Sequence, residues 1–151
     1  MPTERMPNPA VLLPAAMTAL TAVDAAVARA GLDGKLLALS RLRASQINGC
    51  GPGVAEGVHQ AQRYGASTAQ LHAVAAWRAT TWFSDEERAA LALTEAVTRL
   101  ADRPDPVPDR LWDLAAKHFD HRELAALLLT TAITNAVNRL TVPTRQQAGP
   151  R

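Results

Sequence analysis

The sequence predicts an all-helical protein, and its composition and hydrophobic pattern both support that class. Alanine and leucine dominate the 151 residues, and aromatic residues make up only 4% of them. Both of these abundant residues have high helix propensity, β-branched runs are few, and apolar residues recur at three- and four-residue intervals along most of the chain. A chain of this length is expected to form one domain with a substantial core.

The first two helices are predicted over 14–30 and 34–48. Apolar residues recur at helical spacing in both segments. Gly31 is expected to end the first helix, because glycine readily adopts the left-handed conformation that terminates a helix. The Asn48-Gly49 pair is expected to end the second helix for the same reason.

The third and fourth helices are predicted over 51–64 and 67–78. Pro52 suits the first turn of the third helix, where no backbone N–H is needed, and Gly65 closes that helix. The fourth helix begins with Ser-Thr-Ala-Gln. A serine and a glutamine at this spacing can each accept a hydrogen bond from the other's backbone N–H, which is a capping box.

Three further helices are predicted over 84–100, 108–118 and 120–140. The fifth helix starts with Ser-Asp-Glu-Glu, a stronger capping box, and the last starts at Asp120 with a glutamate three residues later. The segment 102–108 is too rich in proline to be helical and is expected to be a linker. The prediction is therefore a bundle of about seven helices.

The flanking segments and the charge pattern exclude several classes of protein. Proline-rich residues 1–9 are predicted to form an extended arm and 143–151 a loose tail, around a single helical domain over 10–142. The net charge of +2 comes from 16 basic and 14 acidic residues that are interspersed, so no basic patch indicates nucleic-acid binding. Pro14 interrupts the N-terminal apolar run, which argues against a signal peptide. No membrane span is expected, and a single cysteine suits the reducing cytoplasm.

The setting of Cys50, the one cysteine in the chain, is that of a reactive thiol. It follows a glycine break and precedes a helix, whose free N–H groups and dipole favour a thiolate. A buried, inert cysteine that fills space is the alternative interpretation. At about 100° per residue, Cys50 shares a helix face with Gly53 and Gly57, whereas His59 lies about 180° away and Glu56 about 120° off this face. The thiol therefore has no evident acid or base on its own helix.

Gly53 and Gly57 have two explanations. Two glycines inside a helix cost about 2 kcal/mol relative to alanine, so a structural reason for them is expected. Either another helix packs closely against this face, or the missing side chains open a cavity beside the thiol. The sequence does not decide between these interpretations.

The sequence resembles the AhpD-like alkylhydroperoxidase and carboxymuconolactone decarboxylase superfamily in four segments: RLRASQINGC at 41–50, AAWR at 75–78, SDEERAALALTEAVTRLAD at 84–102 and ITNAVNRL at 133–140. The likeness extends from about Met6 to Gly149. The resemblance implies an all-helical domain built around a central helical hairpin. It also implies homo-oligomers, commonly trimers or hexamers, with sites near subunit boundaries.

The redox members of this superfamily use a glutamate, two cysteines and a histidine to reduce peroxides. Carried over by position, the first cysteine is Cys50. The second cysteine falls on Gly53, the histidine on Gly57 and the glutamate on Ala38. Three of the four positions therefore lack the family's chemical group. A lone thiol can still form a sulfenic acid, but it has no resolving cysteine within the chain.

Three functional hypotheses follow, and whether the chain is an enzyme stays open. The first is a small-molecule enzyme of the lyase, isomerase or cyclase type, with a pocket enlarged by the three small residues and no cofactor. The second is a non-catalytic ligand-binding or assembly protein. The third is one-cysteine alkylhydroperoxidase activity through Cys50. A small organic ligand or substrate is the expected partner, and no metal site is expected.

Cys50 is the candidate catalytic residue, and Ser45 is a candidate polar group near it. The residues predicted to line the pocket are Gly53, Gly57, Ala38, Gln46, Asn48, His72, Arg78, Asn135, Asn138 and Arg139. The polar ones have a structural alternative, because hydrogen bonds worth about 1 kcal/mol each would also hold helices together. Restoring Gly53→Cys and Gly57→His is predicted to recover peroxidase activity if only these groups were lost.

Overall fold

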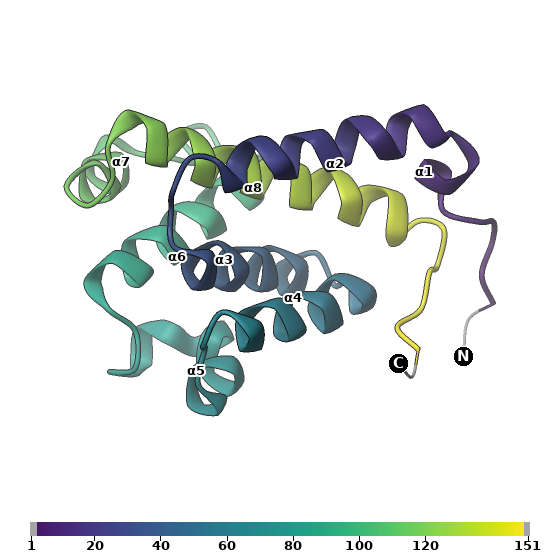
Figure 1. The fold of residues 1–151 in the computed structure, drawn as a ribbon. Coiled ribbons are helices and arrows are strands. Elements are labelled where there is room, and N and C mark those ends of the chain that lie inside the picture. The colour runs from purple at the N-terminus through teal and green to yellow at the C-terminus, as the bar shows by residue number, and fades with distance from the viewer. Residues whose placement is uncertain (1–2, 150–151) are drawn as a thin grey trace.

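The computed structural model describes residues 3–149 and confirms the predicted all-helical class (Figure 1). Within this range the chain forms eight α-helices and one 3-10 helix, with no strand. Their bounds are α1 Pro9–Leu12, α2 Pro14–Ala28, α3 Gly34–Ile47, α4 Gly51–Arg63, α5 Thr68–Ala73, η1 Val74–Ala79, α6 Asp85–Thr98, α7 Asp109–Ala116 and α8 His121–Thr141.

The predicted capping residues make the expected contacts. Reciprocal capping boxes start three helices: Ser67 with Gln70 at α5, Ser84 with Glu87 at α6, and Asp120 with Glu123 at α8. Each such cap contributes about 1 kcal/mol to helix stability. Gly49 has a φ of 64°, a conformation that other residues rarely adopt, and the chain turns there from α3 into α4.

Two local structures differ from the sequence prediction. Helix α1 begins inside the predicted extended arm, because the Asn8 side chain accepts a hydrogen bond from the backbone N–H of Ala10 (2.9 Å) and a proline follows at the first helical position. The predicted fourth helix divides into α5 and η1 with a kink at Ala76 (φ −120°, ψ 28°). Beyond the kink, Trp77 enters the core and donates from Nε1 to Glu95 (3.1 Å). This tertiary contact outweighs the local helix propensity.

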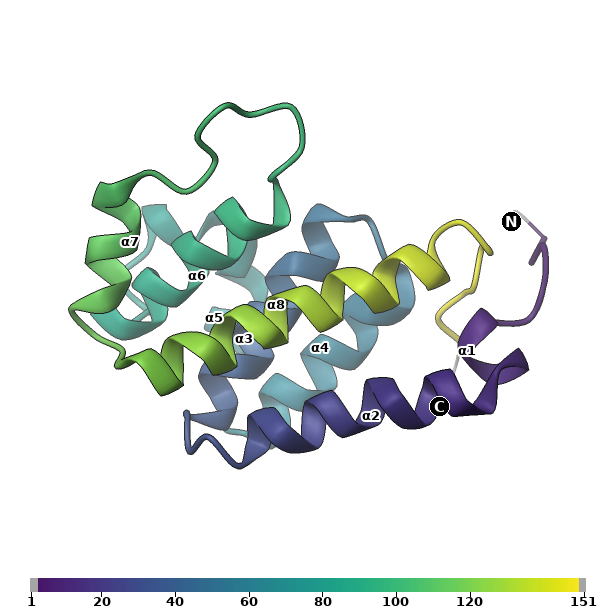
Figure 2. The ribbon, with the colours of Figure 1, turned by 90° about the horizontal axis from the view of Figure 1, so that it is seen from above.

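Helix α3 lies at the centre of the molecule and contacts α4, α6 and α8. It runs alongside α4 as the predicted central helical hairpin (Figure 1). Helix α2 lies along α8, as seen from above in Figure 2. Apolar clusters fill the space on two sides of α3, one including Leu39, Leu42 and Trp77, and the other including Leu36, Leu93 and Leu127.

The N-terminal arm and the C-terminal segment are bonded to each other. The Gln146 side chain donates to Glu4 Oε1 (2.9 Å) and to the backbone carbonyl of Met6 (2.8 Å). The segment predicted as a loose tail is therefore anchored near its start, and the outermost two residues at each terminus lie outside the described range. Among the helices described, none has both the length and the apolar character needed to cross a membrane.

Candidate functional site

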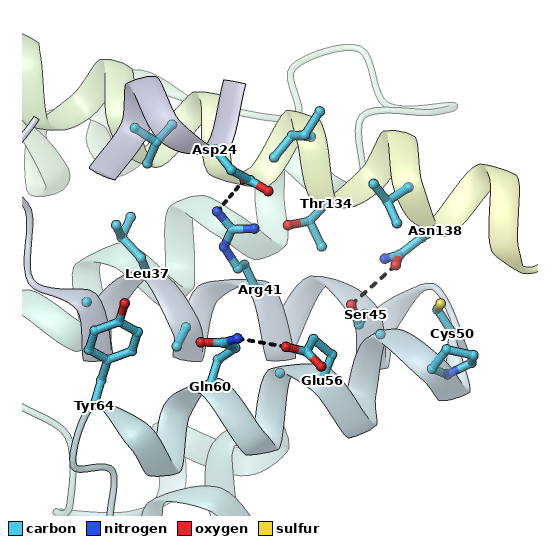
Figure 3. Close-up of a pocket in the computed structure, with 18 of the residues that line it drawn as sticks. Asp24, Leu37, Arg41, Ser45, Cys50, Glu56, Gln60, Tyr64, Thr134 and Asn138 are labelled. Carbon is cyan, nitrogen blue, oxygen red and sulfur yellow. Dashed lines mark hydrogen bonds and ion pairs between the residues drawn. The ribbon is translucent and has the colours of Figure 1, made fainter. Parts of the chain in front are cut away.

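A cavity of about 660 Å³ lies between α2 and α8 on one side and the α3–α4 hairpin on the other (Figure 3). A cavity of this size holds a small organic molecule. Its apolar lining includes Val27, Leu32, Leu37, Ile133 and Val137. Its polar lining includes Asp24, Arg41, Ser45, Glu56, Gln60, Tyr64, Thr134 and Asn138.

Cys50 lies at one end of this cavity, as the residue that precedes α4. Its backbone N–H donates to the carbonyl of Ser45 (3.0 Å) and its carbonyl accepts from the N–H of Val54 (2.9 Å), which fixes the turn between the hairpin helices. The side chain makes no capping hydrogen bond and is only 1% exposed. The sulfur is therefore surrounded by the interior of the protein and is not in contact with bulk water.

Gly53, Gly57 and Ala38 line the cavity together with Cys50, but the glycines do not create its space. A Cβ atom on Gly57 would lie 2.8 Å from Leu42 Cα, and one on Gly53 would lie 2.6 Å from Ser45 Oγ. Atoms of α3, and at Gly53 also Asn138 Oδ1 of α8 at 2.9 Å, already occupy the positions that a Cβ would take. For Gly53 and Gly57, the interpretation that missing side chains enlarge the pocket is thus replaced by the close-packing interpretation.

Ser45 and Asn138 form a polar pair at the Cys50 end of the cavity (Figure 3). Ser45 Oγ donates to Asn138 Oδ1 (3.3 Å), which joins α3 to α8. Both residues are buried, at 1% and 2% exposure. The Nδ2 group of Asn138 has no hydrogen-bond partner among the described residues.

Charged side chains lie between this end and Tyr64 (Figure 3). Arg41 Nη2 donates to Asp24 Oδ1 (2.7 Å), an ion pair between α3 and α2 whose side chains are 29% and 46% exposed. On α4, the Glu56 carboxylate accepts a hydrogen bond from Gln60 Nε2 (2.7 Å). The cavity thus holds two carboxylates and one guanidinium.

Three of the residues predicted to line the pocket instead form a separate network outside it. Asn135 Nδ2 donates to the Thr131 carbonyl (2.8 Å) and to Thr98 Oγ1 (3.3 Å). Its Oδ1 accepts from Asn48 Nδ2 and from Arg139 Nη1, both at 3.0 Å. These bonds connect α8 to α6 and to the end of α3. Asn48, Asn135 and Arg139 therefore hold helices together, which was the alternative to a place in the pocket lining.

Gln46, His72 and Arg78 also lie outside the cavity. Gln46 accepts a long hydrogen bond from Arg43 (3.5 Å), and His72 is exposed on α5. Arg78 donates to Glu95 on α6. All three were predicted to line the pocket, but their side chains lie on helix faces that point away from it.

Glu95 is the centre of a buried charge network beside the core. Its carboxylate accepts hydrogen bonds from Arg43 Nε (2.7 Å), Trp77 Nε1 (3.1 Å) and Arg78. Burial by itself raises the pKa of Glu95, but the hydrogen bonds from Arg78, Arg43 and Trp77 and the charge of Arg43 outweigh it, so the pKa lies below its ordinary value of 4.5. The network joins η1 to α3 and α6.

Sequence reasoning did not identify Asp24 and Arg41, and it set Glu56 aside because that residue lies off the helix face of the cysteine, although all three line the cavity. One signal was present, because Leu37, Arg41 and Ser45 recur every fourth residue and so share a face of α3. No such signal in the sequence indicates that α2 lines the cavity, because the position of α2 beside α8 depends on tertiary packing.

The comparison with known families agrees with this architecture. Residues 14–96 match the model of the carboxymuconolactone decarboxylase family, and they include α2, α3 and α4, three of the four helices around the cavity. The chain belongs to the carboxymuconolactone decarboxylase family.

Individual relatives show how far the similarity extends. A protein of unknown function from Agrobacterium tumefaciens, suggested to be the antioxidant defence protein AhpD, has a crystal structure similar to this chain, with a TM-score of 0.90, 30% identity and coverage of 99% of this chain and 100% of that one. The uncharacterised protein YdfG of Bacillus subtilis is 28% identical over 113 residues, which cover 75% of this chain and 76% of YdfG. The debrominase Bmp8 has the same fold at a TM-score of 0.79, with 18% identity over 90% of this chain and 72% of that one.

Proposed function

We propose that this family member is an enzyme that acts on a small organic substrate by proton transfer, as a lyase, isomerase or cyclase. It would use neither the dithiol chemistry of the redox relatives nor a redox cofactor. The observation that supports this most is the cavity itself, which holds Asp24, Glu56 and Arg41 among apolar walls. Positioned carboxylates in a largely apolar cavity are suited to general acid–base catalysis.

Glu56 is the proposed general base. Gln60 holds its carboxylate through a hydrogen bond of 2.7 Å within the cavity lining. Asp24 is less suited to the role, because its side chain is 46% exposed. The Arg41 guanidinium supplies positive charge that would attract a substrate anion or stabilise negative charge developing in the reaction.

Glu56→Gln is expected to reduce catalysed hydrogen exchange about a hundredfold, because glutamine has nearly the same shape but cannot accept the proton. The assay follows C–H to C–D exchange by proton NMR in D₂O across a panel of oxo acids, enones and lactones that includes carboxymuconolactone. The exposed Glu86 lies outside the cavity lining, and Glu86→Gln serves as the charge-matched control with unchanged exchange.

The competing hypotheses give different results in the same experiments. Saturable binding of panel compounds without exchange would indicate a non-catalytic ligand-binding protein. Brisk consumption of cumene hydroperoxide with dithiothreitol, abolished by Cys50→Ser, would indicate one-cysteine peroxidase activity. The burial of the thiol at 1% exposure argues against that third route, since an external reductant must reach the oxidised sulfur.

We also propose that the chain assembles with copies of itself through the surface of α1 and the start of α2. Val11, Leu12, Leu13 and Met17 are 61%, 52%, 64% and 42% exposed there, and exposed large apolar side chains grouped on one segment are typical of an interaction site. The family resemblance implies that this assembly is a trimer or a hexamer.

Leu13→Glu is expected to shift the protein toward a monomer of 16.1 kDa, because the new charge would have to be buried in the interface. Size-exclusion chromatography with light scattering measures the change. Leu100 is similarly exposed, at 51%, at the end of α6, so Leu100→Glu is the matched control. Equal masses for the wild type and both variants would exclude this surface as the interface.

A further inference from the structure

Asn138 places a hydrogen-bond donor in the wall of the cavity. The residue projects from α8 toward α3 at the Cys50 end (Figure 3) and is 2% exposed. Its Oδ1 accepts from Ser45 Oγ at 3.3 Å, which orients the amide. The Nδ2 group that remains has no partner among the described residues.

A buried amide group without a partner is unfavourable, because it has given up its hydrogen bonds to water without replacing them. Asn135, one turn earlier on the same helix, shows the usual outcome, since both ends of its amide are hydrogen-bonded within the protein. Asn135 lies outside the cavity, whereas Asn138 lines it. Thr94 and Thr130 also have unpaired buried hydroxyls in the described part of the chain, but among these three residues only Asn138 lines the cavity, where a bound molecule could complete its bonding.

The surroundings restrict the chemistry of that molecule. Cys50, Gly53 and Thr141 line the cavity near Asn138, and none of them is an acidic or basic residue of the Asp, Glu, Lys or Arg type. The charged Arg41 lies one turn away from Ser45 along α3 and is paired with Asp24. A carboxylate at Asn138 would therefore lack a cation of its own, and a hydroxyl would bring an extra donor. A neutral carbonyl oxygen accepts a hydrogen bond without either cost.

We propose that Asn138 Nδ2 binds the carbonyl oxygen of an organic substrate whose apolar part lies against Ile133 and Val137. Ser45 is the positioning residue, since its hydroxyl holds Oδ1 and so directs Nδ2 to the ligand. This inference rests on the proposed function and deepens it. When Glu56 removes a proton from the carbon next to the carbonyl, the electron pair of the C–H bond forms a C=C bond and the π pair of the C=O bond moves to the oxygen. The hydrogen bond from Asn138 strengthens as the negative charge of this enolate develops on the oxygen.

The test compares acetophenone with α-methylstyrene, which has nearly the same shape but carries C=CH₂ in place of C=O. Titrations of the ¹⁵N-labelled protein are followed through the side-chain amide signals of Asn138. Acetophenone is expected to shift these signals, and α-methylstyrene is expected to leave them in place. This readout uses the wild-type protein, so it is decisive even where a variant does not fold.

Variants distinguish the contribution of the Asn138 amide to binding from that of the rest of the cavity wall. Asn138→Leu is expected to weaken acetophenone binding about tenfold and to change α-methylstyrene binding by less than about twofold, as the loss of one hydrogen bond predicts. Ser45→Ala is expected to give a smaller loss, confined to the ketone. Thr21 is exposed on α2 outside the cavity lining, and its hydroxyl is bonded to the Met17 carbonyl at 2.9 Å, so Thr21→Val is the control and is expected to bind both probes as the wild type does.

The inference is overturned if the two probes shift the Asn138 amide equally, if neither probe shifts it up to its solubility limit, or if Asn138→Leu weakens both probes alike. These results do not depend on turnover. Selective ketone binding together with unchanged hydrogen exchange in Glu56→Gln would retain this binding site and reject the proposed acid–base mechanism.

Discussion

Replacing Glu95 with glutamine is expected to lower the free energy of unfolding by about 3 kcal/mol, because three arginines would lose their common counter-charge. The Glu95 side chain is 6% exposed, and Arg43, which donates to it at 2.7 Å, is 12% exposed. Glutamine keeps the size of the side chain but leaves the Arg43 charge buried beside that of Arg78. Such an uncompensated charge destabilises the folded state much more than the loss of a surface ion pair.

Urea unfolding followed by circular dichroism measures this loss. Glu86 lies in the first turn of the same helix and is exposed, so Glu86→Gln is the matched control, with an expected loss below about 1 kcal/mol. Equal free energies of unfolding for the two variants would show that the buried network does not stabilise the fold.

The same network predicts a specific pH dependence. The pKa of Glu95 in the folded protein lies below the ordinary value of 4.5. The carboxylate therefore contributes its full stabilisation above that ordinary pKa, and the contribution is lost as the pH falls through the lowered pKa of the folded state. The stability difference between the wild type and Glu95→Gln is expected to stay constant near neutrality and to narrow as the pH falls below 4.5. A difference that widens toward acid pH would contradict this assignment.

Gly57→Ala is expected to destabilise the protein by about 1–3 kcal/mol, although alanine is the better helix former. The new Cβ would lie 2.8 Å from Leu42 Cα and 3.2 Å from the Leu42 nitrogen. These are backbone atoms, so no side-chain rotation relieves the contact and the two helices of the hairpin must separate. The hairpin also lines the cavity, so ligand binding is expected to weaken in parallel.

Gly51→Ala is the matched control, because a Cβ at Gly51 would meet nothing within 4 Å. Its stability by urea unfolding is expected to stay within about 1 kcal/mol of the wild type. A Gly57→Ala variant as stable as Gly51→Ala would show that α3 and α4 can separate without cost.

The glycine contacts also revise one expectation from the sequence. Introducing Gly53→Cys and Gly57→His together was predicted to restore peroxidase activity if only those groups were missing. Because even a methyl group at Gly57 collides with the α3 backbone, we now expect the double variant to unfold more easily and to show no peroxide reduction with dithiothreitol. Efficient turnover by a stably folded double variant would contradict this steric argument.

Much of the fold was predictable because its signals are local. Capping pairs such as Ser84 with Glu87 lie three residues apart and act through the backbone of a single turn. The kink at Ala76 was not predictable, because it accompanies the insertion of Trp77 against Glu95 from another helix. The short helix α1 was missed although Asn8 and Pro9 carried its capping signal.

The amino-acid sequence by itself determined the helical class, the family resemblance and the presence of a single thiol at the start of α4. Tertiary structure alone decided that the glycines serve close packing, that Glu56 and Arg41 share a cavity with that thiol, and that Asn138 rather than Asn135 faces it. The physical reason is that helix formation depends on neighbours within a turn. The lining of a cavity depends on how helices distant in sequence, here α2 and α8, are rotated and packed against the α3–α4 hairpin.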